Sequence, residues 1–80
     1  MHLFGYYHID IAFPDVRLAV ECDGDYWHGT PEQRIKDSKK DAYLRRFGWQ
    51  IIRLPEHKIN SDLGSCVKSV LLSLKSLRAQ

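Results

Sequence analysis

The chain has 80 residues, of which 44% are hydrophobic and 28% are charged, and its formal net charge is +2. This length provides for one domain, residues 1–80, with one hydrophobic core. No apolar run is long enough to span a membrane, and the N-terminus lacks the charged-then-apolar order of a signal peptide, so we expect a cytoplasmic protein with no membrane partner.

The small net charge hides an uneven distribution along the chain. Residues 1–30 contain one arginine and five acidic residues, a net charge of −4, whereas residues 31–80 contain eleven lysines and arginines and five acidic residues, a net charge of +6. An acidic part can hold cations and a basic part can hold a polyanion. The combination favours nucleic acid as the partner. The alternative is that the charged residues only keep two faces of the domain solvated.

Two strands are predicted near the N-terminus. Residues 6–13 alternate between apolar and polar side chains, and residues 17–23 do so again after a proline turn. Because side chains alternate across a strand, Glu21 and Asp23 lie on one face of this hairpin. Strand pairing would bring Asp10 close to both, and carboxylates that converge in this way predict a divalent-metal site.

A helix is predicted between Thr30 and Gly48. Thr30 suits the N-cap, Pro31 the first helical position and Gln33 the third position of a capping box, and Gly48 suits the position after the last turn. Several basic residues of this helix are interpreted as phosphate contacts, with a solvated helix face as the alternative. They are Arg34, Lys36, Lys39 and Lys40.

The same helix has a stripe at i, i+4 and i+7 spacing, formed by Asp37, Asp41 and Leu44. This spacing predicts that Asp37 faces the sheet, while Asp41 is expected to pair with Arg45 four residues later.

Residues 49–54 predict a third strand, and a last helix is predicted from about Leu63. The fold class that follows is α/β, a small mixed sheet of three or more strands flanked by helices. Cys22 and Cys66 are predicted to be buried free thiols, in preference to a disulfide or a zinc site. The apolar stripe of the last helix is interpreted as core packing. Its members are Leu63, Val67, Val70, Leu71, Leu74 and Leu77.

A phosphodiester is a stable anion, and its hydrolysis needs an activated water molecule and neutralisation of charge at phosphorus. Asp10 with Glu21 or Asp23 would bind Mg²⁺ through hard oxygen ligands. His28 has an unperturbed pKa of about 6.5, which suits proton transfer near neutral pH. Asp37 would orient the imidazole if the two side chains lie within hydrogen-bond reach.

The order of these residues resembles the very-short-patch-repair endonucleases and the related EDxHD-type homing endonucleases of the PD-(D/E)xK superfamily. The resemblance covers about residues 7–56. It implies a restriction-endonuclease-like core and hydrolysis of double-stranded DNA, with Mg²⁺ as the cofactor and Mn²⁺ as its substitute. The motifs that carry it are Ile9-Asp10, Glu21-Cys22-Asp23-Gly24, Trp27-His28-Gly29, Lys36-Asp37 and Gly48-Trp49.

The resemblance also implies roles for single residues in the metal site. Asp10 matches the family's metal-binding aspartate at the end of a strand. Glu21 and Asp23 occupy the (D/E)xK step, with Asp23 at the position where lysine is usual. The main-chain carbonyl of Cys22 matches a further metal ligand.

For proton transfer, His28 matches the family's catalytic histidine and Asp37 matches the aspartate that pairs with it. Zinc is not expected, because Asp25 replaces one zinc ligand of the repair enzymes and no histidine-rich run follows. Family members carry a glutamate on a helix before the first strand, whereas only nine residues precede Asp10 here. The chain is therefore either a fragment or a domain without this residue.

These observations favour a metal-dependent DNA endonuclease, the catalytic module of a site-specific homing or repair-type enzyme whose DNA-reading domain lies elsewhere. One alternative is a catalytically inactive nuclease fold that binds DNA, and another is a metal-dependent hydrolase of a different substrate. The carboxylates, retained together with His28 and Asp37, favour the enzyme, because a binding module has no reason to keep buried charges that cost stability.

Overall fold

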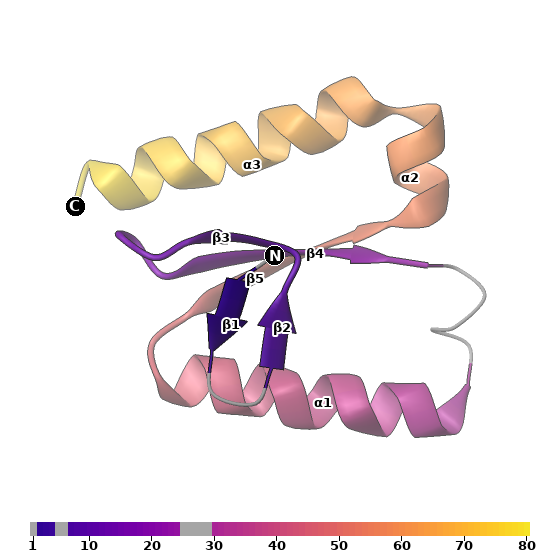
Figure 1. Ribbon diagram of the computed structural model, residues 1–80. Helices are drawn as coiled ribbons and strands as arrows, with labels where there is room; N and C mark the ends of the chain where they lie inside the picture. The colour runs from indigo at the N-terminus through magenta and orange to yellow at the C-terminus, as the bar shows by residue number, and fades with distance from the viewer. Residues whose placement is uncertain (1, 5–6, 25–29) are drawn as a thin grey trace.

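The computed structural model describes residues 2–4, 7–24 and 30–80. A central sheet lies between two layers of helix, with α1 on one face and α3 on the other (Figure 1). The elements in chain order are β1 (His2–Phe4), β2 (Tyr7–Ile9), β3 (Ile11–Phe13), β4 (Leu18–Asp23), α1 (Pro31–Arg46), β5 (Gln50–Pro55), α2 (Glu56–Ser61) and α3 (Leu63–Arg78).

The central sheet has three strands in the order β3-β4-β5. β3 and β4 are antiparallel, and β4 and β5 are parallel and joined by α1 in a strand–helix–strand unit. The predicted α/β class and mixed three-stranded sheet are therefore confirmed, and the arrangement is compatible with a restriction-endonuclease-like core. Within the described residues, no helix combines the length and apolar composition that crossing a membrane requires.

The predicted first strand, residues 6–13, is wrong in its continuity. The chain bends at Asp10, so β2 pairs with β1 in a separate two-stranded hairpin and only β3 joins the central sheet. In Figure 1 the hairpin is drawn on the side of the sheet that α1 covers, and Tyr7 of β2 contacts Tyr43 of α1. Two further elements, β1 and α2, were not predicted from the sequence.

The start and end of α1 follow the sequence signals. Thr30 has extended backbone and its hydroxyl accepts a hydrogen bond from the backbone N–H of Gln33, and Pro31 is the first helical residue. Gly48 has φ of +85°, in the left-handed region that glycine adopts without steric cost. The Gln33 side chain departs from the capping-box expectation in that its amide donates to Asp37, one turn further along the helix.

Alternation along β4 divides the core between the two faces of the sheet. Ala19 packs with Ile9, Leu44 and Trp49 on the face that α1 covers. Leu18 and Val20 pack with Leu74 on the face that α3 covers. Glu21 and Asp23 share the parity of Ala19, which places both carboxylates on the α1 face.

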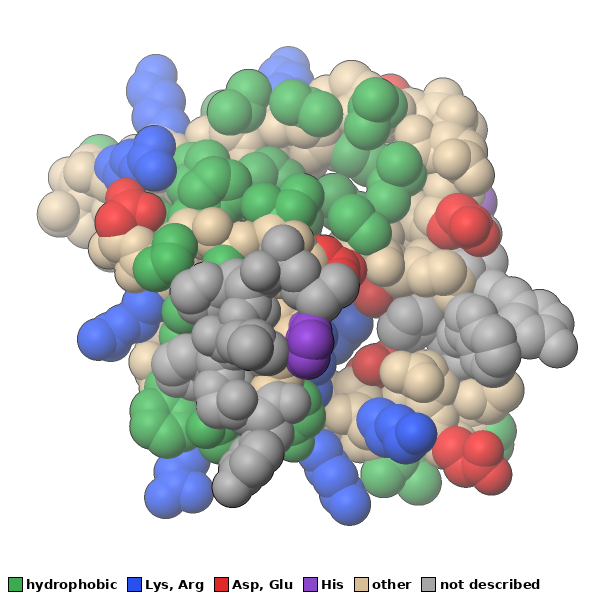
Figure 2. Space-filling view, viewed as in Figure 1, with side chains coloured by type: hydrophobic (Ala, Val, Ile, Leu, Met, Phe, Trp, Pro, Cys, Tyr) green, Lys and Arg blue, Asp and Glu red, His purple; other side chains and the backbone are tan. Residues whose placement is uncertain are grey.

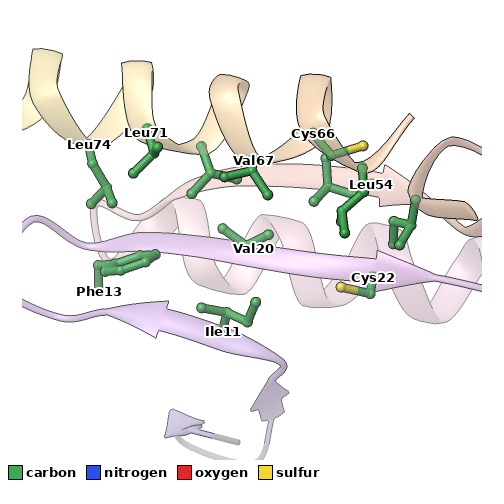
Figure 3. A pocket seen from close by; sticks show the side chains of 12 residues that line it. Ile11, Phe13, Val20, Cys22, Leu54, Cys66, Val67, Leu71 and Leu74 are labelled. Atoms are coloured by element: carbon green, nitrogen blue, oxygen red, sulfur yellow. The ribbon is translucent and has the colours of Figure 1, made fainter. Parts of the chain in front are cut away.

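The apolar stripe of α3 is only partly core, contrary to the prediction. Leu74 is 7% exposed, but Leu63, Val67 and Leu71 are 58%, 48% and 59% exposed. These side chains border an open apolar groove of about 300 Å³ between α3 and the strands β3 and β4 (Figure 3). Figure 2 shows hydrophobic side chains gathered on the surface along α3. The groove lies at the side of the sheet where β3 is the edge strand, and no further strand of the described sheet lies beyond β3 to cover these side chains.

Cys66 is buried and Cys22 is exposed, and both thiols are free. The prediction of free thiols is confirmed, and the prediction that both are buried is wrong for Cys22.

Candidate active site

Asp10 lies at the bend between β2 and β3, beside the part of β4 that extends beyond its partner strand. The pairing of β3 with β4 ends at Ile11 and Val20, so Glu21, Cys22 and Asp23 continue past the edge of β3. Oδ2 of Asp10 accepts a hydrogen bond of 2.9 Å from the backbone N–H of Cys22. This contact takes the place of the missing strand partner and fixes an exposed carboxylate against the end of β4.

The same hydrogen bond indicates where the Cys22 carbonyl points. The N–H and C=O of one residue in a strand are directed to the same side. Because the N–H of Cys22 is directed at Asp10, its carbonyl oxygen is directed to that side as well. The structure therefore directs the Asp10 carboxylate and the Cys22 carbonyl, two predicted ligands, to one side of β4.

Glu21 carries its charge into the interior and is 4% exposed. The Nζ of Lys40, from α1, contacts its Oε1, yet this buried oxygen has no hydrogen-bond partner of normal geometry among the described residues. Burial raises the pKa of Glu21, and the negative charge of Asp10 raises it further, whereas Lys40 acts in the opposite direction. We regard the Lys40 contact as an ion pair without the directionality of a hydrogen bond. The backbone N–H of Asp10 also lowers the pKa of Glu21, so the buried charge is compensated in part by Lys40 and by this hydrogen bond.

Asp23 belongs to a second charge cluster on the same face of the sheet. Nη1 of Arg53, from β5, donates to both oxygens of Asp23 at 3.0 and 3.2 Å, and Nε of Arg53 donates to Asp41 at 3.3 Å. A second Arg53–Asp41 contact is made through Nη2. Burial alone lowers the pKa of Arg53, but the two carboxylates outweigh burial and raise it. The expected pairing of Asp41 with Arg45 is corrected by this network, because Asp41 contacts Arg53 across the layer.

Asp37 is half-buried on α1 and borders a hollow that Tyr7 of β2 also lines. Its Oδ1 accepts a hydrogen bond of 3.0 Å from the Gln33 side chain. His28 belongs to residues 25–29, which lie outside the described residues, and so does its expected pairing with Asp37.

The four basic residues proposed as phosphate contacts differ in exposure. Arg34, Lys36 and Lys39 are exposed, whereas Lys40 is half-buried and turned toward Glu21. Lys36, Lys39 and Lys40 border a hollow of about 310 Å³ between α1 and Tyr7 of β2. Lys40 therefore lies at the junction of this basic hollow and the carboxylates.

The chemistry of these groups indicates which kind of metal ion they could hold. In the described parts of the chain, no three His, Cys, Asp or Glu side chains are arranged as a ready metal site. The donor set still fits a hard divalent cation, since it consists of the Asp10 carboxylate, the Cys22 carbonyl and a buried Glu21 oxygen that lacks a hydrogen bond. The Lys40 ammonium contacts this same oxygen of Glu21.

From the sequence, Lys40 was expected to contact phosphate, and neither Arg53 nor Asp41 was expected to belong to a cluster of charges. A signal for Arg53 was present, because it interrupts the apolar run Ile51-Ile52-Arg53-Leu54 at a strand position. A charged residue in such a run is expected to meet a counter-charge.

The fold is a small α/β domain compatible with a restriction-endonuclease-like core. The model of the REase_MTES_1575 family matches residues 3–74, and the chain belongs to this family. The family name supports the superfamily that the motifs suggested.

The curated relatives are themselves uncharacterized. Two proteins of Mycobacterium tuberculosis, from strains CDC 1551 and H37Rv, are each 29% identical over 70 residues, which is 88% of this chain and 26% of theirs. A protein of Haemophilus influenzae strain Rd is 26% identical over 72 residues, 90% of this chain and 59% of its own. The chain thus spans about a quarter of the length of the mycobacterial relatives. No solved structure matches it.

Proposed function

We propose that this domain is a metal-dependent DNA endonuclease that hydrolyses phosphodiester bonds in double-stranded DNA. One observation carries the proposal: the bend at Asp10 and the extension of β4 bring the Asp10 carboxylate, the Cys22 carbonyl and the buried Glu21 together. This convergence occurs in a chain of a restriction-endonuclease-like family. A buried carboxylate with an unsatisfied oxygen costs stability, which favours its retention for chemistry.

In this proposal, Asp10, Glu21 and the Cys22 carbonyl hold Mg²⁺ or Mn²⁺, and Asp23 lies beside them as a further ligand that Arg53 must release. When bound, the metal neutralises charge on the phosphate and lowers the pKa of a bound water molecule.

His28 transfers a proton to or from the reacting oxygen, and Asp37 orients the imidazole. Zinc has no role in this scheme.

DNA is held by the basic residues of α1. Exposed Lys36 and Lys39 border the hollow that reaches Lys40, and Arg34 extends the exposed charge toward the start of the helix. Phosphate contacts of this kind position the duplex without reading its sequence. We therefore assign base recognition to a separate DNA-reading domain, as in a homing or repair-type endonuclease. The greater length of the relatives supports this assignment.

The second candidate is a nuclease fold that binds DNA without cleaving it. The observation in its favour is that Glu21 and Asp23 already have cationic partners within the protein, Lys40 and Arg53. In a degenerate site, such ion pairs would replace the metal permanently.

Nicking of supercoiled plasmid with Mg²⁺, with Mn²⁺ and with EDTA decides between the two. We expect cleavage with either metal and none with EDTA. Asp10→Asn should lose at least about 10²-fold in rate, because loss of a metal ligand costs several kcal/mol of transition-state stabilisation. Asp15→Asn is the matched control, since it removes the same charge from an exposed pair with Arg78.

Asp15→Asn should nick at the wild-type rate. If the wild-type chain binds plasmid but does not nick it with either metal, the DNA-binding module is the better description. If Asp10→Asn nicks as fast as the wild type, the metal-site assignment is wrong.

A further inference from the structure

Lys40 differs from its basic neighbours on α1 in where its charge lies. Its side chain is 18% exposed and its ammonium contacts Glu21, whose side chain is 5% exposed. Arg34, Lys36 and Lys39 are exposed to solvent on the same helix. The ammonium is thus held at a carboxylate of the proposed metal site.

A divalent cation and an ammonium cannot both contact the same carboxylate oxygen without strong repulsion. Oε1 of Glu21 is buried and has Lys40 as its cationic contact. A metal ion that binds this oxygen must therefore displace the ammonium, and the displaced charge needs a new partner. Without one, the half-buried ammonium would lie unpaired beside the metal, which is costly.

The surroundings of Lys40 indicate what that partner is. Lys40 borders a hollow that Tyr7, Gln33, Lys36, Asp37 and Lys39 also line. On the side away from Glu21, two further lysines therefore outweigh the single carboxylate of Asp37, a balance of charge that suits a phosphate. A DNA phosphate in the hollow would contact the Lys40 ammonium as soon as it left Glu21.

We propose that Lys40 is an internal counter-cation that occupies the metal position on Glu21 until a DNA phosphate draws it away, so that the metal ion and DNA bind with positive coupling. This inference rests on the proposed function and adds to it the order of assembly. Metal binding is weak in the free protein and becomes strong on DNA. By thermodynamic linkage, the metal raises DNA affinity by the same factor, and factors of about 5 to 150 are typical of coupled sites.

The test measures Mn²⁺ affinity by electron paramagnetic resonance of the free ion, with and without a short phosphorothioate duplex that resists cleavage. The duplex alone serves as the blank for Mn²⁺ bound by DNA. In the wild type, the duplex should raise Mn²⁺ affinity about tenfold or more. In Lys40→Met, Mn²⁺ affinity without DNA should rise by about the same factor, and the coupling factor should fall toward one.

Two variants separate the role of Lys40 from a general loss of charge. Lys39→Met removes the same charge from the same hollow, but among the described contacts of Glu21 the cation is Lys40 and not Lys39. This variant should therefore weaken DNA binding and leave Mn²⁺ affinity in the absence of DNA unchanged. Lys40→Arg keeps a cation and should keep the weak affinity of the wild type. Circular dichroism checks the folding of each variant, and Lys40→Gln replaces Lys40→Met if the latter does not fold.

The outcomes distinguish this inference from the proposed function. If Lys40→Met binds Mn²⁺ in the absence of DNA no more tightly than the wild type, Lys40 is not a competing cation, although the metal site stands. If Lys39→Met raises Mn²⁺ affinity as much as Lys40→Met, the effect is general electrostatics and the inference is overturned. If neither the wild type nor Lys40→Met binds Mn²⁺ with or without DNA, the metal site itself fails.

Discussion

Glu21 keeps a carboxylate in the layer between the sheet and α1, where burial raises its pKa. Folding therefore favours the protonated acid. The resulting contribution to stability is fully present below the ordinary value of 4.5, and it is lost as pH rises through the higher folded pKa. Above its folded pKa, Glu21 is a desolvated charge that Lys40 offsets only in part.

Glu21→Gln should change how the stability of the protein depends on pH in EDTA, where no metal compensates the charge. The glutamine is neutral at every pH, so the variant should gain stability relative to the wild type as pH rises from 4 to 8. Urea unfolding across this range measures the difference. Parallel stability curves for the two proteins would show that Glu21 is fully compensated by Lys40.

Arg53 holds two acidic side chains from different elements, Asp23 of β4 and Asp41 of α1. Replacing it with methionine keeps much of the volume but removes the guanidinium that both carboxylates contact. Removal of one partner from a buried ion pair costs about 3–5 kcal/mol, and because Arg53 is 26% exposed we expect about 3 kcal/mol. Urea unfolding at pH 7 measures this cost.

Arg78→Met provides the comparison for Arg53→Met. Arg78 pairs with Asp15 at 3.1 Å, but the side chains are 54% and 57% exposed. An exposed pair contributes about 0–1 kcal/mol, so this variant should unfold close to the wild type. Equal losses in the two variants would mean that the Arg53 network is as solvated as a surface pair.

At the scale of elements, α1 was predictable because its signals are local. The N-cap at Thr30, the proline at Pro31 and the left-handed Gly48 each act within one turn of the helix. The bend at Asp10 was not predictable in this way. It is fixed by a hydrogen bond to the amide of Cys22, twelve residues away, and alternation of side chains carries no signal for such a contact.

The exposed basic residues of α1 give a prediction about DNA binding. The double change Lys36→Ala and Lys39→Ala should make the slope of log affinity against log salt shallower by about 1.8, or about 0.9 for each lost phosphate contact. Lys68→Ala with Lys75→Ala is the matched control, because α3 covers the opposite face of the sheet (Figure 1). Fluorescence anisotropy of a labelled duplex at several salt concentrations measures the slopes. A change confined to the α3 pair would place DNA on the other face.

At the scale of the whole molecule, the two faces of the sheet differ in character. The α1 face carries the carboxylates and their cations, and the α3 face carries the apolar cluster of Leu18, Val20 and Leu74 and the open groove. Side-chain parity in β4 was enough to predict that Glu21 and Asp23 share a face. The partners Lys40 and Arg53 were not assigned, because they come from elements whose placement against β4 depends on tertiary packing.

The open groove leads to the last prediction. Leu74 is 7% exposed and packs on Leu18 and Val20, so Leu74→Ala should destabilise the fold by about 2–5 kcal/mol. Leu71 lies one turn earlier on α3 but is 59% exposed at the groove, so Leu71→Ala should cost less than about 1 kcal/mol.

Urea unfolding of the two variants tests this difference directly. The amphipathic pattern of α3 assigns both leucines to the core, although Leu71 lies about 60° away from Leu74 around the helix axis and is exposed at the groove. If Leu71→Ala costs as much as Leu74→Ala, the groove is covered in solution, and the sequence pattern describes the packing of α3 better than the open groove does.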